Sequence, residues 1–591
     1  MSPSQIIVLA TPVFLLLIAV EFAWGYVKGR NTYRLSDAIN SISLGVLSQL
    51  SAVFTRLLQI GIYSAVYAAV ALYPNPEFWN TWYGCLLALL FYDLCYYWLH
   101  RLGHEIAALW AAHVVHHQSQ DYNLSTALRQ PSTYELLRWI FYLPMALAGV
   151  PPLMFGAVAL IDLLYQFWVH TEQVPKLGWF DRWFCSPSNH RVHHAVNDPY
   201  LDRNYGGILI VWDRLFGSFQ EEGEKCVYGT RAGLNSWDPL WANFEVYWGL
   251  VKDSWHTRRW RDKVRVWFKP PGWRPADLAQ RFPKPAFDLA RVQRFHPPVG
   301  RAVLWFSGVQ FALLLLGVST FLWFADTMPL AQSAVWVAAL SAALWALGAV
   351  LQGRISVLEV LLIEAAALAT AASAAGLVDL HRVFKPLVML IAIVFVAVSR
   401  RVTRAEGRLD ALLMAALAAS LAGDVLLMLP GYFVLGLVAF LLAHLCYLVL
   451  FKLGTVHLQS VGAGTGREVM GVRSVWFPSR LALYLTLGVG AVMYAYLWHG
   501  LPGALRPAVA AYVVVIALMT AQAIGRATLL RNPAAVMVAV GAGFFMLSDS
   551  LLALNRFVQP LPLAQLWVLG TYYVAQILIA RNAIASASNR L

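Results

Sequence analysis

Histidines crowd into one part of this 591-residue sequence, in spacings that suit metal binding. Five lie in HRLGHEIAALWAAHVVHH (100–117), one follows the apolar run QFWV, and three lie in SPSNHRVHH (186–194). In the patterns HxxxH and HxxHH, residues three or four apart share one face of a helix. A neutral imidazole binds iron, zinc or copper through one ring nitrogen and leaves the other to be oriented by a neighbour. The nine residues are His100, His104, His113, His116, His117, His170, His190, His193 and His194.

Nine imidazoles are too many for one metal ion and suit two, each with an open position for a reactant. Catalytic zinc sites need three protein ligands, often with a carboxylate, so a zinc hydrolase fits this set less well than two irons that activate oxygen. His170 stands alone in the sequence, and a lone histidine is as often a surface residue as a ligand. Burying so many unpaired imidazoles would be costly without an ion to coordinate them. The pattern therefore predicts a di-iron site.

Two aspartates in the last third of the chain form a second chemical signal. AGDVLLML (422–429) and LSDSLLAL (547–554) share a small residue, Asp, one variable position and then Leu-Leu-x-Leu. In the next apolar segment, each copy has a polar residue after Ala, namely His444 and Gln576. The second copy lies four apolar segments after the first. Because four is an even number of crossings, both copies cross the membrane in the same direction. The echo predicts a duplicated four-helix unit with Asp424 and Asp549 facing each other, and chance is the alternative for so short a match.

Carboxylates inside a membrane are expensive and indicate function. Asp424 and Asp549 could serve as acid and base, if their surroundings keep one carboxyl protonated and the other ionised. Two alternatives stay open. The aspartates could join helices by pairing with other polar groups, or the unit could be a proton-coupled lipid transporter, since duplicated helices with acids at the midplane also suit transport. The candidate structural partners are Lys385, His444, Tyr572 and Gln576.

Apolar segments must position both sets of groups. Hydrophobic residues make up 59% of the chain and charged residues 13%, and apolar stretches approach the length of about 20 residues that a membrane helix needs. The first stretch, near 6–24, contains Glu21 and lacks a cleavage site, so we expect a retained span rather than a signal peptide. Further segments lie near 42–71, 82–99 and 137–168, the last long enough for two shorter spans or a re-entrant pair. We therefore expect an all-α polytopic membrane protein.

Charge and proline mark a junction between two membrane domains. The net charge is +13, and basic residues concentrate between Lys252 and Arg301, where the sequence FHPPVGR (295–301) ends a proline-rich stretch. The positive-inside rule makes this a cytoplasmic, lipid-facing loop, and no nucleic-acid partner is expected. The histidine site then faces the cytoplasm, and the Leu/Ala-rich spans with Arg favoured over Lys indicate a bacterial inner membrane. The five cysteines form no CxxC, so neither a disulfide framework nor a thiolate site is indicated.

The histidine motifs resemble those of the fatty acid hydroxylase and sterol desaturase superfamily of di-iron membrane oxygenases. Within it, QDYNLSTALRQ (120–130), LLYQFWVHTE (163–172), the stretch 186–219 and VYG (227–229) are similar to the alkylglycerol monooxygenase family, over about residues 30–235. The resemblance implies that all nine histidines ligate two iron ions. It also implies a tetrahydropterin cofactor, O2 as co-substrate, and hydroxylation of the ether-bearing carbon of an alkylglycerol, which then releases a fatty aldehyde.

Several polar residues near the histidines could orient the imidazoles or bind the pterin. Capping and turn formation in a polar layer is the alternative for each of them. Asn189, beside the HxxHH motif, is expected to orient a ligand at most. The sequence does not locate the pterin site. The other candidates are Asp121, Asn123, Glu172, Asp202, Asn204, Tyr205 and Asp213.

From about residue 355 the chain resembles the YhhN/TMEM86-type lysoplasmalogenases, which have eight membrane spans. FKPL (384–387), LAGDVLLML (421–429), GLVAFLLAHLCYL (436–448), MLSDSLLALNRF (546–557) and TYYVAQ (571–576) carry this resemblance. It implies hydrolysis of the vinyl ether of a lysoplasmalogen, with Asp424 and Asp549 as the catalytic pair.

Together these observations predict a histidine-rich di-iron hydroxylase domain (1–300), connecting transmembrane segments (301–354) and an eight-span helical membrane domain (355–591). The expected protein is a bifunctional ether-lipid-cleaving enzyme whose partners are membrane lipids, namely alkylglycerols and lysoplasmalogens. One alternative is a di-iron hydroxylase of another lipid or sterol with a C-terminal lipid-binding or transport module. The other is a monooxygenase whose C-terminal half has lost its catalysis.

Overall fold

The computed structural model describes residues 2–403, 407–453 and 475–588. Over these residues the secondary structure is helical, apart from the isolated bridges Phe184–Leu209 and Ala195–Tyr228. The chain divides into two compact units, Met1–Ile355 and Ser356–Leu591. Within the described part, eleven helices are long and apolar enough to cross a membrane. The predicted all-α polytopic class is thereby confirmed.

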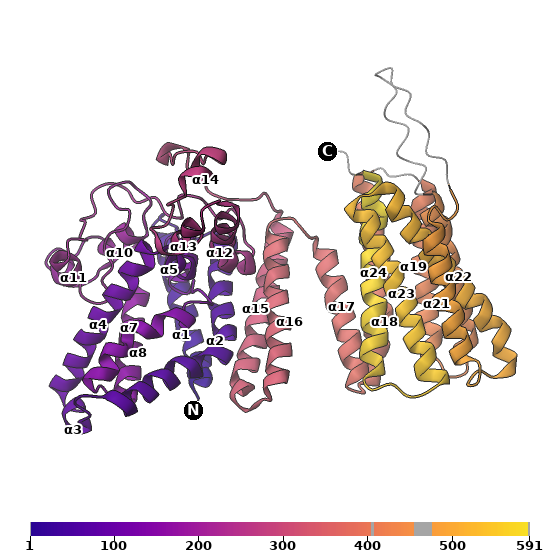
Figure 1. Cartoon of the computed structure of the whole chain (residues 1–591), viewed down its shortest axis with the longest axis horizontal. Coiled ribbons are helices and arrows are strands. Elements are labelled where there is room, and N and C mark those ends of the chain that lie inside the picture. The colour runs from indigo at the N-terminus through magenta and orange to yellow at the C-terminus, as the bar shows by residue number, and fades with distance from the viewer. Residues whose placement is uncertain (1, 404–406, 454–474, 589–591) are drawn as a thin grey trace, which may run out of the picture. The chain divides into compact units, whose positions relative to one another are not determined.

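The first unit is built on a bundle of five helices (Figure 1). Helix α2 packs against α7, and α4 packs against both α7 and α8. Aromatic rings fill the space between these helices. Tyr63 stacks on Phe155 with ring centroids 4.2 Å apart, and Tyr92 stacks on Tyr142 with centroids 4.7 Å apart. Such pairs add to the dispersion energy of the buried area. The five helices are α1 (Pro3–Val27), α2 (Leu35–Val70), α4 (Trp82–Glu105), α7 (Glu135–Ala148) and α8 (Pro152–Trp168).

The apolar stretch 137–168 forms two short helices joined by a tight turn, a form that both predicted arrangements share. Helix α7 ends at Gly149, which has a left-handed φ of 93°. A Cβ at Gly149 would lie 2.2 Å from the carbonyl oxygen of Tyr73, so only glycine fits this turn. Pro152 then starts α8, since proline suits the first turn of a helix. The reversal brings His170, two residues beyond α8, to the other histidines.

Short helices at one end of the bundle carry most of the histidines. Helix α10 shows how local sequence builds this layer: the Ser186 hydroxyl accepts a hydrogen bond from the Asn189 amide, and Pro187 occupies the first turn. The short elements are α3 (Pro76–Trp79), α5 (Ala107–His113), η1 (Val114–His117), α6 (Leu124–Ala127), α9 (Phe180–Trp183), α10 (Pro187–His194) and α11 (Val211–Leu215). They are followed by α12 (Pro239–His256), α13 (Trp260–Phe268), α14 (Ala276–Arg281) and η2 (Leu289–Arg291).

The segment expected to connect the two domains packs within the first unit. Helices α15 (Arg301–Phe324) and α16 (Leu330–Leu351), joined through η3 (Ala325–Thr327), pair with each other and both contact α2. At Gly348 a Cβ would meet the carbonyl oxygen of Trp237 at 2.2 Å, so the missing side chain lets this part of α16 approach the chain before α12. The boundary between the two compact units falls after Ile355.

The second unit contains eight α-helices among its described residues. Seven of them are long and apolar enough to span a membrane, and α24 does not meet that measure, so the count of eight spans stays a prediction. The helices are α17 (Val357–Ala374), α18 (Val378–Thr403), α19 (Gly407–Met428), α20 (Phe433–Leu453), α21 (Arg480–Leu497), α22 (Arg506–Leu530), α23 (Pro533–Phe557) and α24 (Ala564–Ser588). A short 3-10 turn, η5 (Gly503–Leu505), precedes α22.

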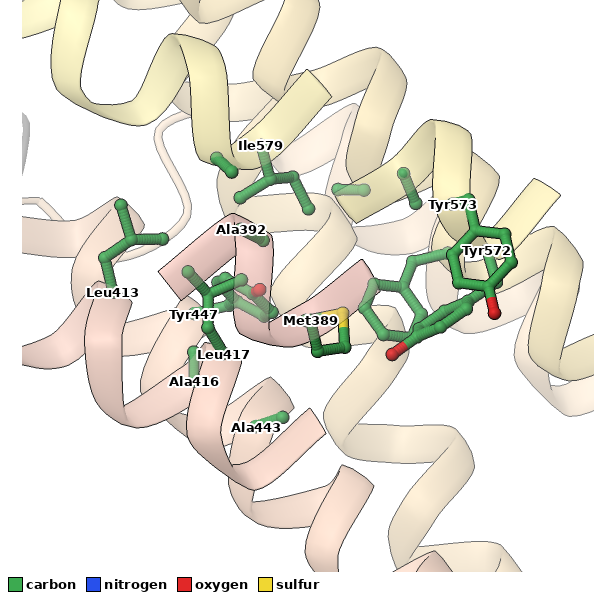
Figure 2. Packing of buried hydrophobic residues seen from close by; sticks show 14 of the residues in the cluster. Met389, Ala392, Leu413, Ala416, Leu417, Ala443, Tyr447, Tyr572, Tyr573 and Ile579 are labelled. Atoms are coloured by element: carbon green, nitrogen blue, oxygen red, sulfur yellow. The ribbon is translucent and has the colours of Figure 1, made fainter. Parts of the chain in front are cut away.

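Small residues allow these helices to pack closely. Figure 2 shows Ala392 of α18, Ala416 of α19 and Ala443 of α20 in one buried cluster with Ile579 of α24. Close backbone approach of this kind is the main source of helix association in lipid, where apolar burial adds no driving force. Helix α19 packs along α20, and α23 packs along α24. The two pairs are the elements that carry the duplicated aspartate motif.

Candidate functional site

The first unit gathers all nine predicted histidines into two buried groups. One group of five brings together His100 and His104 of α4 with His113, His117 and His193 from three other elements. Each imidazole offers a ring nitrogen, and these nitrogens lie within 4.8 Å of one another. The Nε2 atoms of His113 and His117 are 3.1 Å apart. Five nitrogens converging on so small a volume form a donor set for one metal ion.

The second group consists of four histidines from three separated stretches of the chain. His116, His170, His190 and His194 also place their ring nitrogens within 4.8 Å of one another. The Nε2 atom of His170 lies 3.1 Å from that of His116 and 3.1 Å from that of His190. The ring planes of His117 and His194 stack at 4.4 Å, so the two groups are adjacent. His170, ambiguous in the sequence, belongs to this group.

Backbone carbonyls fix which nitrogen of each ring faces inward. The Nδ1 atom of His100 lies 2.8 Å from the Tyr205 carbonyl, that of His116 lies 3.0 Å from the Arg129 carbonyl, and that of His170 lies 2.8 Å from the Gln166 carbonyl. Because a carbonyl only accepts, each Nδ1 donates and each Nε2 keeps its lone pair. This is the arrangement that orients histidine ligands in metal proteins.

Buried nitrogens without partners test whether the residues present fit a metal. The Nε2 atoms of His100, His104 and His193 are buried and make no hydrogen bond. A buried polar atom left unsatisfied costs free energy, and such exceptions call for a missing partner such as an ion. All-nitrogen donor sets suit iron, zinc and copper. The two groups therefore fit two metal ions, as the sequence predicts.

Burial keeps these imidazoles in the form that binds metal. Burial lowers the pKa of His116 to about 4, and it holds the pKa values of His113, His117 and His190 well below the usual value. A charged imidazole in low dielectric is disfavoured, and the neighbouring histidines disfavour it further. These four rings are therefore neutral near pH 7, and each keeps a nitrogen lone pair that can bind metal.

Arg129 holds the loop that carries His116, and the sequence alone did not single it out. Its guanidinium is 1% exposed and donates to the Val115 carbonyl at 2.7 Å, to Asn40 Oδ1 at 2.8 Å and to Gln118 Oε1 at 3.3 Å. Burial lowers the pKa of Arg129 to about 10, which still leaves it charged at neutral pH. The same residue accepts from His116 through its carbonyl, so one residue fixes both the loop and the ring.

Two carboxylates hold the loop that orients His100. Asp213 accepts from the amides of Tyr205 and Gly206, both at 2.7 Å. Asp93 of α4 accepts from the amides of Ile208 and Leu209 and from the Trp212 indole. Asp213 was a predicted candidate, whereas Asp93 was missed because an acid inside an apolar stretch gives no local hint of its partners.

The remaining predicted neighbours divide between orienting and structural roles. Asp202 Oδ1 lies 3.3 Å from His104 Nδ1, so it can orient that ring. Asp121 pairs with Arg34 at 2.7 Å, and Asn123 caps α6. Asn189 and Asn204 donate to backbone carbonyls and so stabilise the fold around α10.

Glu172 lies near Tyr228. Burial first, and then the charge of Glu172, raise the pKa of Tyr228. The Tyr228 ring stacks on Tyr122 at 4.8 Å, and Tyr122 in turn contacts the rings of His170 and His194. Glu172 is therefore linked to the second histidine group through two tyrosines.

In the second unit each aspartate meets polar groups from other helices. Asp424 of α19 accepts from the Tyr572 hydroxyl at 2.7 Å and lies 3.5 Å from Lys385 Nζ. Asp549 of α23 accepts from the Tyr512 hydroxyl at 2.6 Å and lies 3.1 Å from His444 Nε2. Each aspartate thus has one tyrosine and one basic group.

These pairings cross between the two copies of the motif. Asp424 of the first copy bonds Tyr572 on α24, and Asp549 of the second copy bonds His444 on α20. The fourth predicted polar residue, Gln576, accepts from Tyr447 at 2.7 Å and not from an aspartate. Tyr512 was missed, because α22 carries no copy of the aspartate motif.

The two aspartates differ in what they face. Asp549 and Tyr512 line an apolar cavity. The Asp424 side chain is only 2% exposed, against 17% for Asp549. The cavity wall is otherwise mostly apolar, formed by Phe433, Leu437, Gly490, Met493, Leu497, Val509, Val513, Ile516, Met546, Ser550, Leu552, Ala553 and Phe557. Such a wall suits an alkyl chain that presents one reactive group to Asp549.

Comparisons with known proteins match each unit separately. The fatty acid hydroxylase family matches residues 85–218, and the YhhN family matches residues 380–583. Alkylglycerol monooxygenase of Homo sapiens is 38% identical over 331 residues, which cover 55% of this chain and 72% of the relative. The Xenopus tropicalis alkylglycerol monooxygenase is 35% identical, over 52% of this chain and 69% of the relative.

A different relative matches the second unit. Lysoplasmalogenase TMEM86B of Sus scrofa is 34% identical over 202 residues, which cover 34% of this chain and 75% of the relative. No solved structure matches the chain significantly. The chain therefore belongs to the alkylglycerol monooxygenase family of fatty acid hydroxylases, and it carries in the same polypeptide a YhhN-family unit related to the lysoplasmalogenases.

Proposed function

We propose that this chain cleaves ether lipids in two ways, with an oxygenase in the first unit and a vinyl-ether hydrolase in the second. The observation that carries the proposal is the convergence of nine buried imidazoles into a group of five and a group of four. The fusion supports it further, since one unit has relatives named alkylglycerol monooxygenase and the other has a relative named lysoplasmalogenase.

In the first unit, each histidine group would hold one iron ion. When bound, the irons with O2 and electrons from a tetrahydropterin supply the oxidant for inserting one oxygen atom into a C–H bond. Oxygen is reduced, the pterin is oxidised, and the second oxygen atom leaves as water. The proposed substrate is an alkylglycerol, hydroxylated on the alkyl carbon that bears the ether oxygen. The hemiacetal then collapses to a fatty aldehyde and free glycerol.

The residues of the chain contribute orientation and exclusion of water. Tyr205, Arg129 and Gln166 hold three imidazoles through their carbonyls. The nine histidines are buried, so little bulk water reaches the reacting carbon. We place the alkyl chain along the apolar helices α4 and α8, with the glycerol head among the polar residues around α10. We also place this site on the cytoplasmic side, where the basic segment lies, in a bacterial inner membrane.

In the second unit, we propose that Asp549 is the catalytic carboxyl. A vinyl ether is hydrolysed when a proton is added to the carbon beyond the ether-bearing carbon and water attacks the resulting oxocarbenium ion. One carboxyl can perform both steps in turn, first giving its proton to carbon and then, as carboxylate, taking one from the attacking water. The products are a fatty aldehyde and the glycerol compound.

Asp424 is the second predicted carboxylate and does not line the cavity. We propose that it positions the core around the site through Lys385 and Tyr572. The sequence left open a purely structural role for the contacts of Lys385 and Tyr572 with an aspartate. In this proposal those contacts hold Asp424 in place and thereby support the site.

The test uses purified, iron-loaded full-length protein in detergent. Alkylglycerol, a tetrahydropterin and O2 should give fatty aldehyde, and His116→Ala should abolish it because the group of four histidines loses a ligand. Lysoplasmalogen should give aldehyde without pterin, and His116→Ala should leave that activity intact. No pterin-dependent aldehyde from fully iron-loaded protein would refute the ether-cleaving oxygenase and leave hydroxylation of another lipid.

A further inference from the structure

The apolar cavity of the second unit has two arginines at one end. The cavity is bounded by the start of α20, the end of α21, the start of α22 and the end of α23. Arg556 lies over the ring of Phe433 at 4.0 Å, and Phe433 is part of the cavity wall. Arg506 lies over the ring of Trp498 at 4.2 Å, next to the wall residue Leu497. The helix ends at this side of the cavity therefore carry positive charge.

Arg556 stands at a defined distance from the reactive carboxyl. It follows Asp549 by seven residues on α23, so both lie on the same face of that helix. Seven residues of α-helix rise by roughly 10 Å. A glycerol backbone with its phosphoester oxygen spans most of this separation, and the contacts at its two ends span the rest. The fit places a reactive ether at Asp549 and an anionic phosphate at Arg556.

Neither arginine is neutralised by an acid in the described part of the chain. Arg556 makes no ion pair there, and Arg506 donates only to the Trp498 carbonyl at 3.4 Å, while its Nε is buried without a partner. Among the described residues that line the cavity, Asp549 is the one carboxylate, and it is already bonded to Tyr512 and His444. A guanidinium held on an aromatic face keeps its donors free for phosphate oxygens.

We propose that Arg556, aided by Arg506, binds the phosphate of a single-chain ether lysophospholipid whose vinyl ether lies at Asp549. The glycerol backbone lies in the cavity between Arg556 and Asp549, and the hydrocarbon chain leaves Asp549 on the side of Met546, away from Arg556. The arrangement makes Arg556 a specificity residue that favours phosphorylated ethers over ethers of free glycerol. This inference rests on the vinyl-ether hydrolysis proposed above.

A different reading of the same arginines is that they only reach the polar headgroups of the surrounding bilayer, as arginines at helix ends often do. That reading gives them no preference between substrates. Detergent micelles without phospholipid remove the bilayer headgroups, so any dependence on the substrate phosphate that persists there arises at the cavity.

The experiment measures hydrolysis by the full-length chain in maltoside micelles. The two substrates are a 1-alkenyl-glycerophosphocholine and the 1-alkenylglycerol with the same chain. The variants are Arg556→Gln and, as a matched control, Arg480→Gln, an exposed arginine at the opposite end of cavity-lining helix α21. Arg556→Gln should raise KM for the phosphorylated substrate about tenfold, the scale of one charge-assisted contact. It should leave kcat, and both constants for 1-alkenylglycerol, unchanged.

Each outcome bears on a different claim. Arg556→Gln acting equally on both substrates, or on neither, while the wild type hydrolyses them, would overturn the phosphate site and leave the hydrolase standing. An equal effect of Arg480→Gln would reduce the result to general surface charge and also overturn the site. Hydrolysis of neither substrate by the wild type would overturn the proposed hydrolase and the substrate role of Arg556 with it.

Discussion

At the scale of residues, the backbone carbonyls that orient the imidazoles matter as much as the histidines themselves. Spacing in the sequence points to eight of the nine histidines, because residues three or four apart share one face of a helix, whereas His170 stands alone. Spacing does not identify Arg129, Asp93 or Tyr512, because each acts on a partner from a distant stretch or another helix. The clustered histidines were therefore predictable, whereas these three residues were not.

Arg129→Lys should loosen the metal site without touching a ligand. Lysine keeps the charge but loses the planar fork that reaches Val115, Asn40 and Gln118 together. We expect a loss of stability of about 2–4 kcal/mol, since buried polar groups are left without partners, and a lower iron content after purification. Thermal unfolding in detergent and metal analysis measure both effects.

The control for this change is Arg182→Lys, because Arg182 is an exposed arginine of the same unit. It should behave as the wild type in both measurements. Wild-type iron content and an unchanged unfolding midpoint in Arg129→Lys would show that Arg129 does not hold the loop.

Asp549→Asn and Asp424→Asn should fail in different ways. Asp549 lines the cavity, so its amide analogue should lower kcat for lysoplasmalogen at least about a hundredfold, the usual scale of acid–base catalysis, with little change in stability. Asp424 pairs with buried Lys385, so its amide analogue leaves a buried charge unpaired and should cost about 3–5 kcal/mol. Kinetics and thermal unfolding of both variants distinguish these effects. Equal loss of kcat with equal stability would contradict the division of roles.

At the scale of elements, close helix contacts in the second unit depend on single glycines. A Cβ at Gly423 of α19 would lie 2.6 Å from the ring of Phe440 on α20. Gly423→Ala should therefore force the two helices apart and destabilise the unit by about 1–3 kcal/mol, as overpacking does. Vinyl-ether hydrolysis should fall with it, because α19 carries Asp424 and α20 carries His444.

Gly543→Ala is the matched control on α23. A Cβ there meets nothing within 4 Å, so alanine only improves the helix propensity. The unfolding midpoint should stay the same or rise. If Gly423→Ala were as stable as Gly543→Ala, the close contact between Gly423 of α19 and the Phe440 ring of α20 would not limit the packing of these helices.

The helices themselves were predictable to different degrees. Hydropathy indicates the long apolar helices directly, but it leaves the stretch 137–168 open between two short spans and a re-entrant pair. The turn at Gly149 joins two short helices through a contact with Tyr73 that the sequence does not reveal, and both arrangements have this form. Helix α24 does not reach the hydropathy of a membrane span, although it packs in the same unit. Its polar residues, such as Gln576, bond inside the unit and lower its hydropathy.

At the scale of the whole molecule, the chain is two compact units with separate chemical groups. Hydropathy placed the connecting segment 301–354 between the domains, whereas α15 and α16 pack on α2 of the first unit. Hydropathy cannot separate a connecting span from a packed one, because both are equally apolar.

Removing metal should divide the two activities. Each unit has its own core, and in the described part of the chain His444 is the one histidine bonded to Asp549. Dialysis of the full-length protein against a chelator should abolish pterin-dependent aldehyde formation and leave vinyl-ether hydrolysis unchanged. Adding iron back should restore the first activity alone. Parallel loss of both activities would mean that the second unit also depends on metal.

The central claim is that the nine histidines hold two iron ions as a group of five and a group of four. Metal analysis of the purified full-length chain tests it most directly, in the wild type and in the double variant His190→Ala, His194→Ala. We expect two irons per chain in the wild type and one in the variant, because His190 and His194 both belong to the group of four. A single metal per chain in the wild type, zinc in place of iron, or an unchanged count in the variant would contradict it.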